Sequence, residues 1–156
     1  LMEHMGNALA KRFRGVRITK VLTAESSGIA LACFVARALD VPAVYAKKFQ
    51  TGYIDPEVYS AETHSFSLEK SYTLRVSKKY LDGDDVVLLV DDILSNGQAI
   101  LSLASNTLSD GNVAGVGVAI EKAMRDGGRV LRRMGIRVEA LATVEHIEGD
   151  RIILKD

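Results

Sequence analysis

The chain has 156 residues, of which 47% are hydrophobic and 26% charged, and its formal net charge is zero. This length suits one domain with one core, and the balanced charge argues against a general nucleic-acid surface or an attraction to acidic membranes. One cysteine excludes an intrachain disulfide and is typical of a reducing compartment, so we expect a cytoplasmic protein. Cys33 lies in an apolar helical pattern, which predicts a place in the core.

The first third of the chain alternates between helical and strand patterns. Residues 1–13 have helical spacing from the first residue, so we expect the natural N-terminus to be longer. Residues 18–24 predict a buried strand, 26–40 a helix, and 41–48 a second strand with proline at its entrance.

A less regular region follows. Residues 49–60 contain Gly52 and Pro56 and predict a loop, in which Tyr53 and Tyr59 have no role that the pattern defines. Residues 58–70 and 72–81 have looser strand patterns that predict an antiparallel ribbon at a sheet edge.

The second half has clearer elements. "DVVLLVD" is apolar without alternation, which indicates a strand buried on both faces, and a helix ending at Gly111 follows it. The expected elements are strands at 85–91, 113–122, 137–147 and 151–156 and helices at 96–111 and 127–135. The alternation predicts an α/β fold with a mainly parallel central sheet flanked by helices.

Polar residues follow four of the predicted strands, in the stretches "AESSGIA", "AKK", "DDILSNGQA" and "IEKAMRDGGR". Since ligands bind at the carboxyl ends of parallel strands, we expect these stretches to meet at one site. Two of them open helices with small residues and a glycine, which favours binding of phosphate groups on backbone amides. Lys47 and Lys48 add positive charge.

Asp91 and Asp92 lie between these two phosphate-binding stretches. Carboxylates repel a bare phosphate, so they need another partner, either the vicinal hydroxyls of a sugar or a divalent metal. A phosphate, a sugar diol and a second phosphate group together describe a phosphorylated ribose that carries a diphosphate.

"DDILSNGQA" resembles the phosphoribosyl pyrophosphate (PRPP) motif of the type I phosphoribosyltransferases, and its Asn-Gly-Gln spelling looks most like the family's xanthine members. "ESSGIA" resembles the family's diphosphate loop and "VAGVGVAIEK" its purine-site strand. The resemblance implies the type I phosphoribosyltransferase fold in one domain, residues 1–156, with an incomplete N-terminal hood. It also implies Mg²⁺ bound with PRPP, a 6-oxopurine substrate with xanthine favoured, and a homodimer.

The resemblance implies a role for each matched residue. Asp91 and Asp92 contact the ribose hydroxyls directly or through Mg²⁺, and Lys122 reaches the purine carbonyl oxygen. Residues 49–60 close over the reaction. The implied 5-phosphate site comprises Ser95, Asn96, Gly97, Gln98 and Ala99, and the implied diphosphate site comprises Glu25, Ser26, Ser27, Gly28, Lys47 and Lys48. The diphosphate loop often has a non-proline cis peptide in this family.

Several other interpretations stay open. The acidic pair also occurs in response-regulator receiver domains. Ser26 or Ser27 could simply cap a helix, and Lys122 could simply pair with Glu121 or a nearby acid. The family commonly has an aromatic residue after "IEK", whereas this chain has Ala123 and Met124. The same fold also serves purine- or PRPP-sensing transcription regulators and guanine or hypoxanthine phosphoribosyltransferases. The three histidines are scattered and indicate no metal site.

Overall fold

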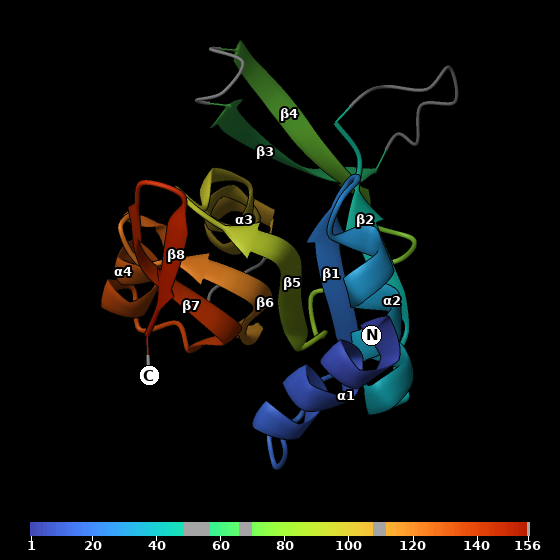
Figure 1. Ribbon diagram of the computed structural model, residues 1–156. Helices are drawn as coiled ribbons and strands as arrows, with labels where there is room; N and C mark the ends of the chain where they lie inside the picture. The colour runs from blue at the N-terminus through green and yellow to red at the C-terminus, as the bar shows by residue number, and fades with distance from the viewer. Residues whose placement is uncertain (49–56, 66–69, 108–111, 156) are drawn as a thin grey trace.

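The computed structural model describes residues 1–48, 57–65, 70–107 and 112–155 (Figure 1). The helical segments are α1 (Met2–Arg12), α2 (Ile29–Leu39), α3 (Gln98–Ser102), the π-helical turn η1 (Leu103–Thr107) and α4 (Gly127–Arg133). The strands are β1 (Lys20–Ala24), β2 (Ala43–Ala46), β3 (Val58–Ser65), β4 (Lys70–Ser77), β5 (Val87–Leu94), β6 (Val113–Lys122), β7 (Val138–Glu148) and β8 (Arg151–Leu154).

Six of the strands form one sheet in the order β2-β1-β5-β6-β7-β8. Every neighbouring pair is parallel except β7–β8, which is an antiparallel hairpin at one edge. This arrangement confirms the predicted α/β fold. β3 and β4 form the predicted antiparallel ribbon as a separate sheet, which lies beyond the arrowheads of β1 and β2 in Figure 1.

The central sheet separates two clusters of buried side chains. Alternate residues of a strand face opposite ways, so Val21, Leu88 and Val90 pack with α1 and α2. Leu22 and Leu89 pack instead with α3, α4 and the ribbon. Residues 87–90 of β5 are fully buried because both faces of that strand are covered, as the continuous apolar run predicted.

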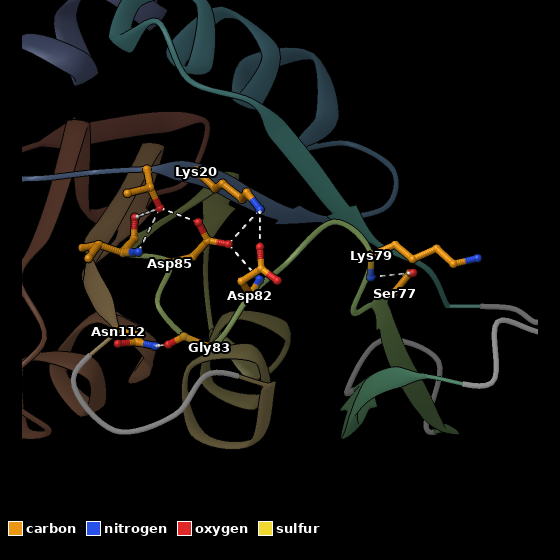
Figure 2. A network of polar contacts seen from close by, with 9 residues as sticks. Lys20, Ser77, Lys79, Asp82, Gly83, Asp85 and Asn112 are labelled. Atoms are coloured by element: carbon orange, nitrogen blue, oxygen red, sulfur yellow. Dashed lines mark hydrogen bonds and ion pairs between the residues drawn. The ribbon is translucent and has the colours of Figure 1, made fainter.

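A polar network connects the amino ends of β1 and β5 (Figure 2). The buried carboxylate of Asp85 accepts hydrogen bonds from Thr19 Oγ1 at 2.7 Å and from the Asp82 amide at 2.8 Å. Lys20 Nζ lies 2.8 Å from Asp85 Oδ2. This end of the sheet is therefore held by charge and hydrogen bonds as well as by apolar packing.

The prediction for Cys33 was wrong, because its side chain is exposed. The buried stripe of α2 consists of Leu31, Ala32, Val35 and Ala36, and Cys33 lies off this stripe. In a helix with apolar residues on most sides, spacing alone did not identify the buried side.

Several predicted boundaries also differ. β5 continues to Leu94, because it stays paired with β6 after Asp91. The predicted helix 96–111 begins at Gln98 as α3 and continues into the π-helical turn through Thr107, and residues 108–111 lie outside the described residues. β3 begins at Val58, where the predicted strand 58–70 begins, and so includes residues 58–60 of the expected closing loop. Residues 49–56 of that loop, with Tyr53, lie outside the described residues. Within the described residues, no helix is long and apolar enough to cross a membrane.

Candidate active site

The candidate site lies where the connections of the sheet diverge, between β1 and β5. From β1 the chain continues outward to β2, whereas from β5 it continues in the other direction to β6. Such a reversal leaves a crevice at the carboxyl ends of the two strands, where open α/β sheets bind ligands. The loop that follows β1 and the turn that follows β5 border this crevice, as predicted for the two phosphate-binding stretches.

The loop after β1 contains a cis peptide bond between Glu25 and Ser26, as the resemblance implied. The carboxylate of Glu25 has a partner within the protein, because its Oε1 accepts a hydrogen bond from the backbone amide of Lys48. Its own amide donates to the Ala46 carbonyl at 3.0 Å. Glu25 thus fastens the loop after β1 to the chain that leaves β2, while the side chains of Ser26 and Ser27 are exposed.

Gly28 ends this loop and is buried against β1 and β5. A Cβ atom at this position would overlap Thr23 Oγ1 and lie 2.8 Å from Asp91 Oδ1, which is closer than a carbon atom can approach. Glycine is therefore required for the loop to approach the acidic pair, which is a packing reason that sequence reasoning did not include. The buried Thr23 is part of the same contact.

Asp91 and Asp92 lie within β5 and not after it, but in the part of β5 that is no longer paired with β1. The last β1–β5 pair is Leu22 with Leu89, so the two aspartates line the crevice beyond it. Asp92 Oδ1 accepts hydrogen bonds from Ser27 Oγ at 3.1 Å and from the Ile93 amide at 2.9 Å. The structure thus brings the acidic pair and the predicted diphosphate loop into direct contact.

The two aspartates differ in their surroundings. Burial raises the pKa of Asp91 to about 7, and the adjacent Asp92 side chain adds to this increase. The Asp92 amide, which donates to Asp91 Oδ1 at 2.9 Å, and the ammonium of Lys48 lower the pKa of Asp91 in part. Perturbed carboxyl groups in a crevice are typical of functional sites, because folding alone does not favour them.

The predicted phosphate turn, Ser95–Ala99, leads directly into α3. Gly97 has a φ of +70°, a left-handed conformation that favours glycine, and it precedes the first residue of the helix. The turn rests on the start of α4, where the Gly127 amide donates to the Ser95 carbonyl at 3.1 Å. The first amides of a helix have no partner within it, so this turn can present donors to an anion.

The lysines lie on opposite sides of these loops. Lys47 forms a backbone bridge with Arg75 of β4, and Lys48 is half-buried with its ammonium 5.4 Å from the centre of the Tyr72 ring. Lys122 ends β6 and is half-buried. Lys48 is close enough to Asp91 to lower its pKa, whereas among the described residues no hydrogen bond or ion pair joins Lys122 to the acidic pair.

Sequence reasoning did not identify the ion pair between Glu121 and Arg132. The buried carboxylate of Glu121 accepts two hydrogen bonds from Arg132, at 2.6 and 2.7 Å. Glu121 is therefore the partner of Arg132, which removes the suggestion that it pairs with Lys122. The adjacent glycines of "RDGGR" were the available signal, because a Cβ at Gly128 would overlap Glu121 Oε1.

The described residues contain no group of three or more histidine, cysteine, aspartate or glutamate side chains that could hold a metal ion. Mg²⁺ commonly keeps several waters and is bound by one or two carboxylates together with substrate phosphates. Asp91 and Asp92 supply hard oxygen donors of this kind beside the phosphate-binding stretches. The donor set therefore fits a Mg²⁺ ion that arrives with a phosphorylated substrate.

Solved structures of phosphoribosyltransferases share this architecture. Adenine phosphoribosyltransferase from Giardia lamblia, complexed with 9-deazaadenine, superposes with a TM-score of 0.81 at 26% identity, covering 93% of this chain and 80% of that chain. The enzyme from Thermoanaerobacter pseudethanolicus superposes with a TM-score of 0.74 at 22% identity, covering 91% and 80%. The fold is therefore that of the type I phosphoribosyltransferases.

Sequence relatives define the branch. A xanthine phosphoribosyltransferase from Ruminiclostridium cellulolyticum is 42% identical over 153 residues, which is 97% of this chain and 80% of the relative. One from Heliobacterium modesticaldum is 46% identical over 150 residues, or 96% of this chain and 79% of the relative. The chain belongs to the xanthine phosphoribosyltransferase family. No protein-family model matches the sequence.

Proposed function

We propose that this chain transfers the phosphoribosyl group of PRPP to xanthine, giving xanthosine 5'-monophosphate and diphosphate. The observation that carries the proposal is the contact of Ser27 Oγ with Asp92 Oδ1, at 3.1 Å, in the crevice between β1 and β5. It joins one helix-opening loop to an acidic pair that continues into a second helix-opening turn. The names of the relatives support xanthine as the base.

The proposed roles follow from the chemistry of each group. Asp91 and Asp92 bind the ribose hydroxyls, directly or through Mg²⁺ that enters with PRPP. Lys122 binds the purine carbonyl. The 5-phosphate is held by Ser95, Asn96, Gly97, Gln98 and Ala99, and the diphosphate by the loop of Ser26, Ser27 and Gly28 with Lys47 and Lys48. Glu25 has a positioning role in this proposal, because its carboxylate accepts the Lys48 amide.

In the proposed reaction, the bond from ribose C1 to the diphosphate oxygen breaks and a bond from C1 to purine N9 forms. The transition state resembles an oxocarbenium ion, as in other glycosyl transfers. Lys47 and Lys48 offset the charge that develops on the leaving diphosphate, and Asp91 and Asp92 hold the ribose in place. The residue before Asn96 is Ser95 and not an acid, so the proton of the purine passes to solvent, which suits a base that ionises easily.

Three further parts of the proposal concern the setting of the reaction. Bound Mg²⁺ would supply positive charge on the diphosphate. The protein acts as a homodimer, which sedimentation measurements test, and it works in the cytoplasm. The single cysteine supports the last point, because it is compatible with a reducing compartment.

The test is to incubate the protein with PRPP and Mg²⁺ and, separately, with xanthine, guanine, hypoxanthine or adenine, while nucleotide formation is measured. We expect product with xanthine at the highest kcat/KM. Product with guanine, hypoxanthine or adenine but not with xanthine would overturn the assignment of xanthine as the substrate. No product with any base would overturn the proposed enzymatic function. As a matched pair, we expect Asp92→Asn to reduce kcat by about a hundredfold, since it removes charge from the site, and Asp150→Asn, in an exposed turn, to leave it unchanged.

A further inference from the structure

The inward face of the β3–β4 ribbon has a tyrosine near each end. The register pairs Tyr59 with Val76, Ala61 with Leu74 and Thr63 with Tyr72, so these six side chains share one face. The central members are buried in the core between the sheet, α3 and the ribbon, and both tyrosines pack against them. Tyr59 and Tyr72 therefore occupy comparable positions at opposite ends of one apolar surface.

Tyr72 lies at the end of this surface that is nearer to the crevice. Lys47 and Arg75 exchange two backbone hydrogen bonds of 2.9 Å in an antiparallel bridge. Because β4 runs antiparallel to the chain leaving β2, the step from Arg75 back to Tyr72 continues past the carboxyl end of β2. That direction leads toward the loops that border the crevice.

Lys48 connects Tyr72 with the site. Its backbone amide donates to Glu25 Oε1, in the loop after β1, and its ammonium lies 5.4 Å from the centre of the Tyr72 ring. A cation at this distance over an aromatic face is attracted to the ring. The lysine is thus held at its backbone by one side of the crevice and at its ammonium by the ribbon.

The surroundings of Tyr72 are polar on the crevice side. Thr63, its partner across the ribbon, is buried. Burial raises the pKa of Tyr72, Thr63 lowers it in part, and the carboxylate of Asp91 raises it. The phenol is therefore neutral at physiological pH and lies within electrostatic reach of the acidic pair.

We infer that Tyr72 is a positioning residue whose ring supports the Lys48 ammonium and directs it toward the diphosphate end of the crevice. This inference rests on the proposed function, in which Lys48 binds the diphosphate. A lysine side chain loses considerable rotamer freedom when it is fixed in one geometry. The ring already restricts the lysine in the unliganded protein, so less side-chain conformational entropy is lost when the anion binds.

The other end of the ribbon supplies a matched control. Tyr59 lies under the ammonium of Lys78, at 5.5 Å, which reproduces the lysine–tyrosine geometry away from the acidic pair. Both tyrosines are half-buried on the same inward face. Loss of either ring removes similar packing, but only Tyr72 lies under a lysine that is hydrogen-bonded to the loop after β1.

The experiment measures the dissociation constant of inorganic diphosphate, with Mg²⁺ present, by calorimetry on the full chain. We expect Tyr72→Leu to weaken binding about three- to tenfold, the effect of one cation–ring contact. Tyr72→Phe keeps the ring and restores affinity to within about twofold, and Tyr59→Leu leaves it unchanged. Weakening by Phe as large as by Leu, or by Tyr59→Leu as large as by Tyr72→Leu, would overturn the inference.

A double-mutant cycle separates positioning from general loosening of the ribbon. In the Lys48→Met background, we expect Tyr72→Leu to have no further effect on diphosphate affinity, although it still lowers the melting temperature. An equal effect in both backgrounds, or a wild-type protein that binds no diphosphate, would overturn the inference. Binding needs no turnover, so a protein that shows this coupling but no transfer to any purine would overturn only the proposed function.

Discussion

Asp91 is buried at the point where the loop after β1 meets β5, and its position is unfavourable for a charged group. Its pKa of about 7 means that the folded protein releases this proton less readily than an unfolded chain does. Between about pH 4 and pH 7 the native state therefore binds more protons, and the free energy of unfolding falls as the pH rises through this interval. The site thus holds a carboxylate at the expense of stability.

Asp91→Asn removes this destabilising charge and keeps an oxygen for the Asp92 amide. We expect the variant to be more stable than the wild type by about 2–4 kcal/mol at pH 8, without ligand, and to differ little near pH 4, where the wild-type carboxyl is protonated. Urea denaturation across this pH interval measures the difference. The control is Asp150→Asn, and a stability difference for Asp91→Asn that does not change with pH would contradict the assignment.

At the scale of elements, the phosphate turn depends on a short helix that the chain reaches much later. The bidentate pair of Glu121 and Arg132 fixes α4 against the end of β6. The first residue of α4, Gly127, then lies against the turn, where a Cβ would come within 2.5 Å of the Ser95 carbonyl oxygen. A change in the ion pair therefore reaches the turn through backbone contacts.

Arg132→Met tests this dependence, since it leaves the buried carboxylate of Glu121 without its partner. We expect a loss of about 2–4 kcal/mol in the free energy of unfolding and a higher KM for PRPP. The neighbouring exposed residue provides the control, because Arg133→Met removes the same charge from the same helix. Denaturation and steady-state kinetics measure both variants, and equal results for the two would show that the pair does not support the turn.

The sequence predicted the elements better than their limits. Continuous apolar runs identified β5 and β6, and the small residues around Gly28 and Gly97 identified both helix-opening stretches. The end of β5 was not predictable from Asp91, because pairing with β6 keeps polar residues in the strand. The Glu121–Arg132 pair and the place of Tyr72 under Lys48 depend on contacts between distant segments, which local patterns do not contain.

At the scale of the whole molecule, the carboxyl ends and the amino ends of the parallel strands form two edges of the sheet with different roles. The carboxyl edge contains the candidate site, with its buried and poorly compensated Asp91. The amino edge contains the network of Thr19, Lys20, Asp82 and Asp85, in which the polar groups satisfy one another (Figure 2). Burial acts to raise the pKa of Asp85, but the contacts with Lys20, the Asp82 amide and Thr19 outweigh it, and the pKa is lowered.

Asp85→Asn is expected to destabilise the protein by about 2–3 kcal/mol at pH 7, because it removes the charged partner of Lys20. A lowered pKa means that the contribution is present at neutral pH and is lost as the carboxyl is protonated, so the difference from wild type shrinks toward pH 3. Urea denaturation at both pH values measures it. Asp84→Asn, at the exposed neighbouring position, is the control.

The kcat of the same Asp85→Asn variant tests whether the amino edge contributes to the reaction. We expect the kcat of Asp85→Asn, measured well below its melting temperature, to equal that of the wild type. A reduced kcat in a fully folded Asp85→Asn protein would contradict the separation of a stabilising edge from a reactive one.

The two loops of the crevice are anchored in different layers of the protein. The loop at Gly28 continues into α2, on the face covered by α1, whereas the turn at Gly97 continues into α3, on the face covered by the ribbon. A molecule that touches both loops is therefore a cross-link between the two hydrophobic clusters on opposite faces of the sheet. Binding of one ligand in this crevice is therefore expected to stabilise both faces of the sheet together.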